Sequence, residues 1–170
     1  MVTSLMRELL VVLATPPLTS GDRTLQRVRL ATTQLGYSTT RIANVVSIET
    51  QDVNDLSRVD IPTRSWMKSR ATIAEHLAVE PAVLLAFGCS LPSGPARTAY
   101  KAQLAWLGAA LRDAGVTEVI TVGDRPFHPS RWQRYTSRAH PGVDFEAALR
   151  KSYIRSSPAL HLTTAENRRL

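Results

Sequence analysis

Four short, almost wholly apolar segments recur along the chain, separated by longer stretches whose apolar residues have helical spacing. Continuous apolar runs of this length are typical of strands that are buried on both faces of a parallel sheet. We therefore expect strands near residues 8–14, 41–47, 82–87 and 117–122. Their alternation with helices predicts an α/β fold, a three-layer α/β/α sandwich with a four-stranded, mainly parallel sheet.

The length of 170 residues fits one domain with a core of its own. We expect a single α/β domain over residues 1–155, followed by a loosely ordered basic tail over residues 156–170. Cys89 is the single cysteine, which excludes an internal disulfide and favours a reducing compartment. Because no segment resembles a signal peptide or is long enough to span a bilayer, we expect a soluble, cytoplasmic protein.

Polar loops rich in proline and glycine follow the predicted strands. Ligands of parallel sheets bind beyond the carboxyl ends of the strands. We therefore expect the site to form from the loop at 15–23, the region after Asn44, and the loops at 88–94 and 123–132. The last predicted element is a short helix near residues 145–153.

The formal net charge of +7 indicates an anionic partner, without choosing between nucleic acid and anionic lipid. Between residues 123 and 155, seven basic residues stand against three acidic ones, and aromatic residues are interleaved with the arginines. Such interleaving suits phosphate contacts and base stacking, whereas a solvated basic surface is the alternative. The candidate contacts to nucleic acid are Arg125, Phe127, Arg131, Trp132, Arg134 and Arg138.

Two polar residues are candidates for the chemistry. Asn44 interrupts an apolar run, and its amide either reads a base edge with a donor and an acceptor or bonds to the backbone as a structural group. His128 lies between Phe127 and Pro129, in a loop that the prolines stiffen. A rigidly held imidazole can donate to a developing oxyanion or exchange a proton, and a plain surface histidine is the alternative.

The first loop precedes a predicted helix, whose amide N–H groups favour an anion. In the alternative interpretation this is an ordinary turn, and Ser20 or Asp22 caps the helix. No group of His, Cys and carboxylate residues has the spacing of a zinc site, and neither a glycine-rich phosphate loop nor a nucleophile elbow occurs. We therefore expect no metal and no cofactor.

Several short pieces run in order from about Leu9 to Tyr135. They are DRTLQR at 22–27, LGY at 35–37, NVVS at 44–47 with Thr50, DL at 55–56, AFG at 86–88 and RPFHP at 125–129. In order and spacing they resemble the uncharacterised family catalogued as domain of unknown function 1643, which occurs in bacteria and phages. Where that family usually carries an Asn-Pro-Ser segment, this chain has TPP at 15–17.

A second, more distant resemblance is carried by four segments. They are TP at 15–16, IANVVS at 42–47, LLAFGCS at 84–90 and HPS at 128–130. They are similar to motifs of the uracil-DNA glycosylase superfamily, whose members have a four-stranded parallel sandwich. The resemblance implies that Asn44 reads an extruded base and His128 stabilises the departing base, with Ser90 and Ser130 at the DNA backbone. Thr15 stands where those enzymes carry a carboxylate or an amide.

These observations predict a DNA glycosylase-like protein that binds DNA rather than RNA and excises a base, including a modified one, by N-glycosidic hydrolysis. Thr15 or Asp22 would position the water, Arg131 would hold phosphate, and Phe127 or Trp132 would stack or wedge. Two alternatives remain open: a non-catalytic nucleic-acid-binding module on the same fold, and an enzyme acting on free nucleotides. Strong salt dependence of the affinity would favour a duplex partner over a free nucleotide. No membrane partner is expected.

Overall fold

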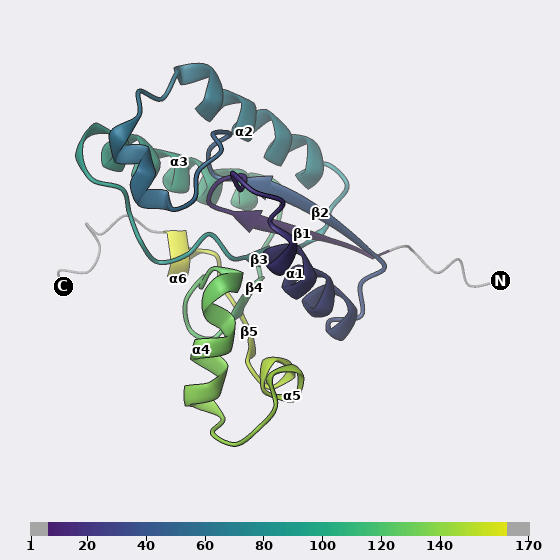
Figure 1. Cartoon of the computed structure of the whole chain (residues 1–170). Helices are drawn as coiled ribbons and strands as arrows, with labels where there is room; N and C mark the ends of the chain where they lie inside the picture. Colours follow the sequence, from purple (N-terminus) through teal and green to yellow (C-terminus); the bar gives the residue numbers. More distant parts are fainter. Residues whose placement is uncertain (1–6, 163–170) are drawn as a thin grey trace, which may run out of the picture.

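The computed structural model describes residues 7–162, which form a five-stranded sheet with helices on both faces (Figure 1). The strands are β1 (Glu8–Leu13), β2 (Thr39–Asn44), β3 (Ala82–Leu85), β4 (Val119–Val122) and β5 (Tyr153–Ser156). They lie in the order β2-β1-β3-β4-β5, and the first four are parallel. The predicted α/β class and the four parallel strands are therefore confirmed.

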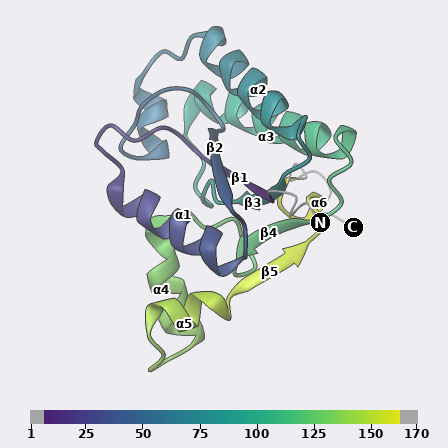
Figure 2. The same cartoon turned by 90° about the vertical axis from the view of Figure 1, so that its right-hand side faces the viewer.

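Helices connect the strands and cover the sheet on both sides, as the two views show (Figure 2). They are α1 (Asp22–Gln34), the 3-10 helix η1 (Val53–Arg58), α2 (Thr63–Leu77), α3 (Gly94–Asp113), α4 (Pro129–Ala139), α5 (Phe145–Arg150) and α6 (Ala159–Leu162). Side chains of α1, α4 and α5 pack into one buried cluster, and those of α2, α3 and α6 pack into the other.

Strand β1 lies in the middle of the sheet, and its side chains alternate between the two clusters. Leu9, Val11 and Leu13 face α1 and α4, whereas Leu10 and Val12 face α2 and α3, because successive side chains of a strand point to opposite sides. All five are buried, and burying each one stabilises the fold by about 1.5–3 kcal/mol. This two-sided burial explains the continuous apolar run.

The expectation of four strands is wrong by one. Strand β5 pairs antiparallel with β4, from Val119 opposite Ser156 to Val122 opposite Tyr153. It lies at the edge of the sheet, where Ile154 remains 40% exposed. An edge strand needs no continuous apolar run, so its sequence carries little signal. The predicted helix at 145–153 correspondingly ends earlier, with α5 at Phe145–Arg150.

Two segments beyond β4 also differ from the expectation. The loop expected to run to residue 132 gives way to helix α4, which begins at Pro129. Helix α6 lies within the segment expected to be a tail, and its Leu162 is buried against the α3 side of the core. The rest of that segment, residues 163–170, is outside the described residues.

Candidate functional site

A cleft with a volume of about 1010 Å³ opens at the carboxyl ends of the parallel strands. Its lining comes from the segments 13–25, 42–44, 50–53, 87–90 and 127–138. These segments include parts of all four loops that the carboxyl-end rule predicts. The volume lies at the upper end of the range of small-ligand pockets, about 300–1,000 Å³. Asn44 and His128 line this cleft together.

Asn44 is the last residue of β2 and carries an unusual side chain. Its Oδ1 is buried and has no hydrogen-bond partner among the described residues. The alternative in which this amide bonds to the backbone is therefore not what the structure contains. An unpaired buried acceptor costs about 1–3 kcal/mol, and this one belongs to a residue that lines the cleft.

The backbone after Asn44 is held firmly by the core. The Val45 N–H donates to the Leu13 carbonyl of β1 at 2.8 Å. From the other side, Gln103 Nε2 of α3 donates to the Val45 carbonyl at 2.9 Å, and Gln103 is 2% exposed. Arg70 Nε in turn donates to Gln103 Oε1 at 2.8 Å. This network fixes the backbone of Val45, which follows Asn44, and so fixes the point from which the Asn44 side chain projects.

His128 is the N-cap of α4, and its ring is oriented by Ser130. The Ser130 backbone N–H donates to His128 Nδ1 at 3.2 Å, and the Ser130 hydroxyl lies 2.9 Å from the same nitrogen. A backbone N–H can only donate, so Nδ1 carries the lone pair and the ring proton is on Nε2. The geometry therefore selects a neutral imidazole with Nε2–H as its donor.

The electrostatic surroundings of His128 favour the same neutral form. Burial lowers the pKa of the imidazole, the charges of Arg131 and Arg27 lower it further, and the charge of Asp52 opposes them. Protonation would also place an N–H on Nδ1, facing the N–H of Ser130. A neutral ring with its proton on Nε2 still donates a hydrogen bond, so it can stabilise negative charge that develops beside it.

Helix α4, which carries these groups, is fixed to the domain by Arg27 and Tyr135. Arg27 of α1 donates to the Pro129 carbonyl at 2.7 Å, and its guanidinium lies 5.4 Å from the ring centroid of Phe145. The Tyr135 ring packs on Gly123, where a Cβ would lie 2.5 Å from Tyr135 Cζ. Gly123 also has a φ of 82°, which favours glycine.

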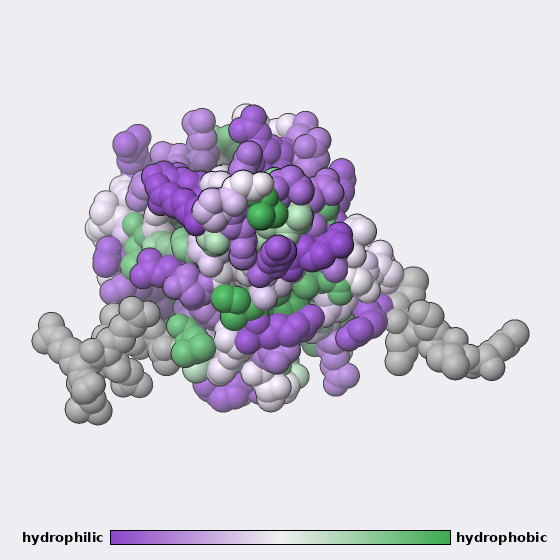
Figure 3. All heavy atoms as spheres, turned by 90° about the horizontal axis from the view of Figure 1, so that it is seen from below, coloured by the Kyte–Doolittle hydropathy of each residue, from purple (hydrophilic) through white to green (hydrophobic). Residues whose placement is uncertain are grey.

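The basic residues of α4 form a row along the cleft. Arg131, Arg134 and Arg138 line it and are exposed, as is Arg23 of α1. Their spacing of three and four residues puts the α4 arginines on one helix face. Arg125 is exposed beside Cys89, outside the cleft lining. Figure 3 looks at the molecule from below, where α4 and α5 lie in Figure 1, and hydrophilic residues cover most of that face.

The aromatic residues predicted to meet a base divide into two kinds. Trp132 is fully buried, and its Nε1 donates to the Phe127 carbonyl at 2.8 Å, so it is not available for stacking on a base, contrary to our expectation. An indole on the inner face of a helix packs into the core. The basic residues beside Trp132 in the sequence give no sign that this position lies on the inner face. Phe127 lines the cleft half-buried, 5.1 Å from the Tyr135 ring.

Thr15 and Asp22, the residues expected to position water, both line the cleft. Thr15 Oγ1 lies 2.6 Å from Thr50 Oγ1, so its hydroxyl is already engaged. Asp22 is exposed in the first turn of α1, after Gly21, and caps no N–H with its side chain. Ser90 is exposed in the loop after β3 and also lines the cleft.

Pattern reasoning missed three residues of the cleft and its support. Arg27 belongs to a helical stretch whose charges look like a solvated face, and its contacts to Pro129 appear only in three dimensions. Thr50 and Asp52 lie in an irregular segment with no periodicity to mark them. The signals available were the position of this segment after a predicted strand and, for Thr50, its place among the pieces that resemble the DUF1643 family.

The comparisons with known proteins give one match. The model of the family described as protein of unknown function, DUF1643, matches residues 8–130, from the start of β1 to the His128-Pro129-Ser130 segment. No curated protein and no solved structure matches the chain significantly, so the link to the uracil-DNA glycosylase superfamily is not shown. Among the described residues there is no group of three or more His, Cys, Asp or Glu side chains suited to a metal, and no helix long and apolar enough to cross a membrane.

Proposed function

We propose that this chain, which belongs to the DUF1643 family, is a DNA glycosylase-like protein that binds DNA and excises a base by hydrolysing its N-glycosidic bond. The observation that carries the proposal is the meeting of two unlike groups in one cleft. Asn44 offers a buried, unpaired acceptor, and His128 offers a donor on a neutral ring. Together they are complementary to the edge of a base that presents both a donor and an acceptor.

Asn44 supports recognition of the base. A ligand that supplies an N–H group would give this Oδ1 a partner that the described residues do not supply. A ligand without a matching donor would leave this oxygen buried and unpaired, so the free-energy cost would weaken the binding of the wrong ligand. Selectivity of this kind suits a pocket that receives a single extruded base.

His128 supports the chemical step. Breaking the bond between a base nitrogen and the sugar leaves negative charge on the base and positive charge on the sugar. A preorganised donor beside the base oxygen lowers that barrier, and one such donor typically contributes about 10²–10³-fold in rate. The Ser130 contacts prepare the ring before the substrate arrives.

The arginine row supports DNA as the partner. Arg131, Arg134 and Arg138 are exposed along the edge of the same cleft, where the phosphates of a strand with an extruded nucleotide would pass. A free nucleotide would contact one or two of these arginines with its phosphates, whereas successive phosphates of a DNA strand would contact all three. Phosphate contacts supply most of the sequence-independent affinity of DNA-binding proteins.

A second candidate is a non-catalytic DNA-binding module on the same fold. One observation favours it: Thr15 has no carboxylate, and its hydroxyl is paired with Thr50. Such a module would use Asn44 and His128 to hold an unstacked base without cleaving it.

An assay for abasic sites separates these functions. Oligonucleotides, each carrying one normal, deaminated or methylated base, are incubated with the protein, and alkali-labile sites and free base are measured at several salt concentrations. The proposal expects release from one class of base, with binding that weakens steeply as salt rises. Salt-dependent binding without release of any base would establish the binding module, and salt-insensitive binding would favour a free nucleotide as the ligand.

A further inference from the structure

The segment after β2 brings a carboxylate to the wall of the cleft. Thr50, which is 5% exposed, donates its N–H to the Pro16 carbonyl at 3.1 Å and pairs its hydroxyl with Thr15. This double contact anchors the segment to the loop that follows β1. Asp52 follows two residues later and lines the cleft together with His128.

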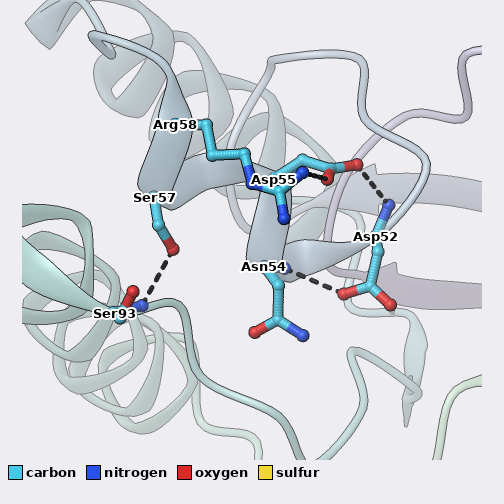
Figure 4. Close-up of polar contacts among 6 residues, drawn as sticks. All are labelled: Asp52, Asn54, Asp55, Ser57, Arg58 and Ser93. Carbon is cyan, nitrogen blue, oxygen red and sulfur yellow. Dashed lines mark hydrogen bonds and ion pairs between the residues drawn. The ribbon is translucent and has the colours of Figure 1, made fainter.

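The carboxylate of Asp52 is oriented by a capping box at η1 (Figure 4). Asp52 Oδ1 accepts from the Asn54 N–H at 2.8 Å, and the Asp52 N–H donates to Asp55 Oδ2 at 3.0 Å. The helix is held in turn, because the Ser93 N–H donates to Ser57 Oγ at 3.0 Å. Asp52 Oδ2 receives no hydrogen bond from the described residues, so one oxygen of a fixed carboxylate is left for solvent or ligand.

Asp52 and the imidazole of His128 line the same cleft. The charge of Asp52 acts on His128 and raises its pKa, against the larger effects of burial, Arg131 and Arg27. Asp22 also lines the cleft but is not among the groups that act on His128. Asp22 lies in the first turn of α1, where a carboxylate is favourable for the helix itself. Of the two carboxylates that line the cleft, Asp52 is the one whose side chain is held by a hydrogen bond, from the Asn54 N–H.

We infer that Asp52 is the general base that activates the attacking water, in the place that Thr15 cannot fill, an inference that rests on the proposed function. Thr15 lacks an acidic group, whereas Asp52 combines a fixed direction with a free oxygen. General-base catalysis of this kind contributes typically about 10²–10⁴-fold in rate.

The step balances as a simple hydrolysis. The bond between C1′ and the base nitrogen breaks, and its electron pair goes to the base, whose oxygen is held by the Nε2–H of His128. The water oxygen bonds to C1′, and a proton of that water passes to Asp52. The carboxylic acid then returns the proton to the base anion, through solvent, which leaves a free base, a sugar with a hydroxyl on C1′ and an ionised Asp52.

Asp52→Asn is the direct test, measured under single-turnover conditions on an oligonucleotide that the wild-type protein cleaves. Asparagine caps a helix about as well as aspartate, so the fold is kept while the proton acceptor is lost. The rate constant is expected to fall about 100-fold or more with unchanged DNA affinity. The matched control is Asp60→Asn, the same change at an exposed carboxylate that does not line the cleft. Its rate should stay within a few-fold of wild type.

The outcomes separate the inference from the proposed function. Equal losses in Asp52→Asn and Asp60→Asn would mean that the rate does not depend on the carboxylate in the cleft, and would overturn the inference. A wild-type rate in Asp52→Asn, with a slow His128→Ala, would overturn it while leaving the glycosylase function standing, and a selective loss in Asp22→Asn would move the base to Asp22. A wild-type protein that releases no base from any oligonucleotide would overturn both.

Discussion

The two walls of the cleft are built from opposite chemistry. We call the residues at the end of β2 and in the loops after β1 and β2 the strand wall, namely Thr15, Asn44, Thr50 and Asp52. The helix wall consists of the residues at α4, namely His128, Arg131, Arg134 and Arg138. The strand wall offers acceptors: a buried amide oxygen and a free carboxylate oxygen. The helix wall offers donors and positive charge. The proposed N-glycosidic cleavage would create positive charge on the sugar and negative charge on the base, and a cleft with one wall of each kind would suit both.

The walls also differ in how they are held. The strand wall is attached to the central strands and to the buried Gln103, whose side-chain amide donates to the Val45 carbonyl beside Asn44. The helix wall is carried by a short helix fixed by Arg27 and by the stacking of Tyr135 on Gly123. We therefore expect the side chains of the strand wall to be held rigidly. The position of the helix wall should depend on a few contacts of α4 with the rest of the domain.

The largest expected effect comes from removing the central group of each wall. His128→Ala should lower the single-turnover rate by about 10²–10³-fold, because it removes a donor contact that strengthens as negative charge builds on the base. Asn44→Ala should also lower the rate, because it removes the acceptor that selects and holds the extruded base. DNA affinity, measured by fluorescence anisotropy, should change little. The matched control is His140→Ala, which alters the histidine at the other end of α4, outside the cleft lining. A loss confined to one wall would contradict the division of labour between the two.

Reversing charge on the helix wall should act on affinity instead. The double change Arg131→Glu and Arg134→Glu should weaken DNA binding by at least about tenfold and lower the salt slope by about 2, since about one counterion is released per phosphate contact. Both side chains are exposed, so the melting temperature should hardly move. The control reverses Arg97 and Arg112 of α3, which are exposed but outside the cleft. Equal weakening by both pairs would show that net charge, and not this wall, holds DNA.

The smallest effect is a pH dependence that belongs to the helix wall. The folded state lowers the pKa of His128, so below the ordinary value of about 6.5 the unfolded chain takes up a proton before the folded one. The stability contributed by this group is therefore present above that value and is lost as the pH falls through the lowered pKa. Urea unfolding between about pH 5 and pH 8 should show a shallower fall toward acid for His128→Gln than for wild type. Parallel curves would contradict the neutral ring assigned to His128.

Much of the sheet was predictable because central parallel strands have a strong physical signature. The apolar run that contains β1 is continuous because both of its faces are buried, and the loop rule then places Asn44 and His128 at one edge. Strand β5 escaped because an edge strand such as Tyr153–Ser156 buries little, and the sequence beside it is polar.

The parts of the site that escaped prediction depend on contacts between distant segments. Asp52 differs from any loop aspartate only through the Thr15–Thr50 contact that brings its segment to the cleft. Trp132 is of a residue type that stacks on bases, and only the packing of α4 against the sheet shows that its side chain points into the core. Side-chain type indicates what a residue can do, whereas burial decides whether it can reach a ligand.

The strand order bears on when the cleft forms during folding. Strand β1 pairs with β2 and with β3, and the latter partner begins at Ala82, far along the chain. The helix wall arrives later still, after β4 is complete. Such non-local pairing pays the entropy of closing long loops before it gains contacts, which makes folding slow. A nascent or partly unfolded chain therefore lacks both walls of the cleft, and any activity of a destabilised variant should decline in step with its folded fraction.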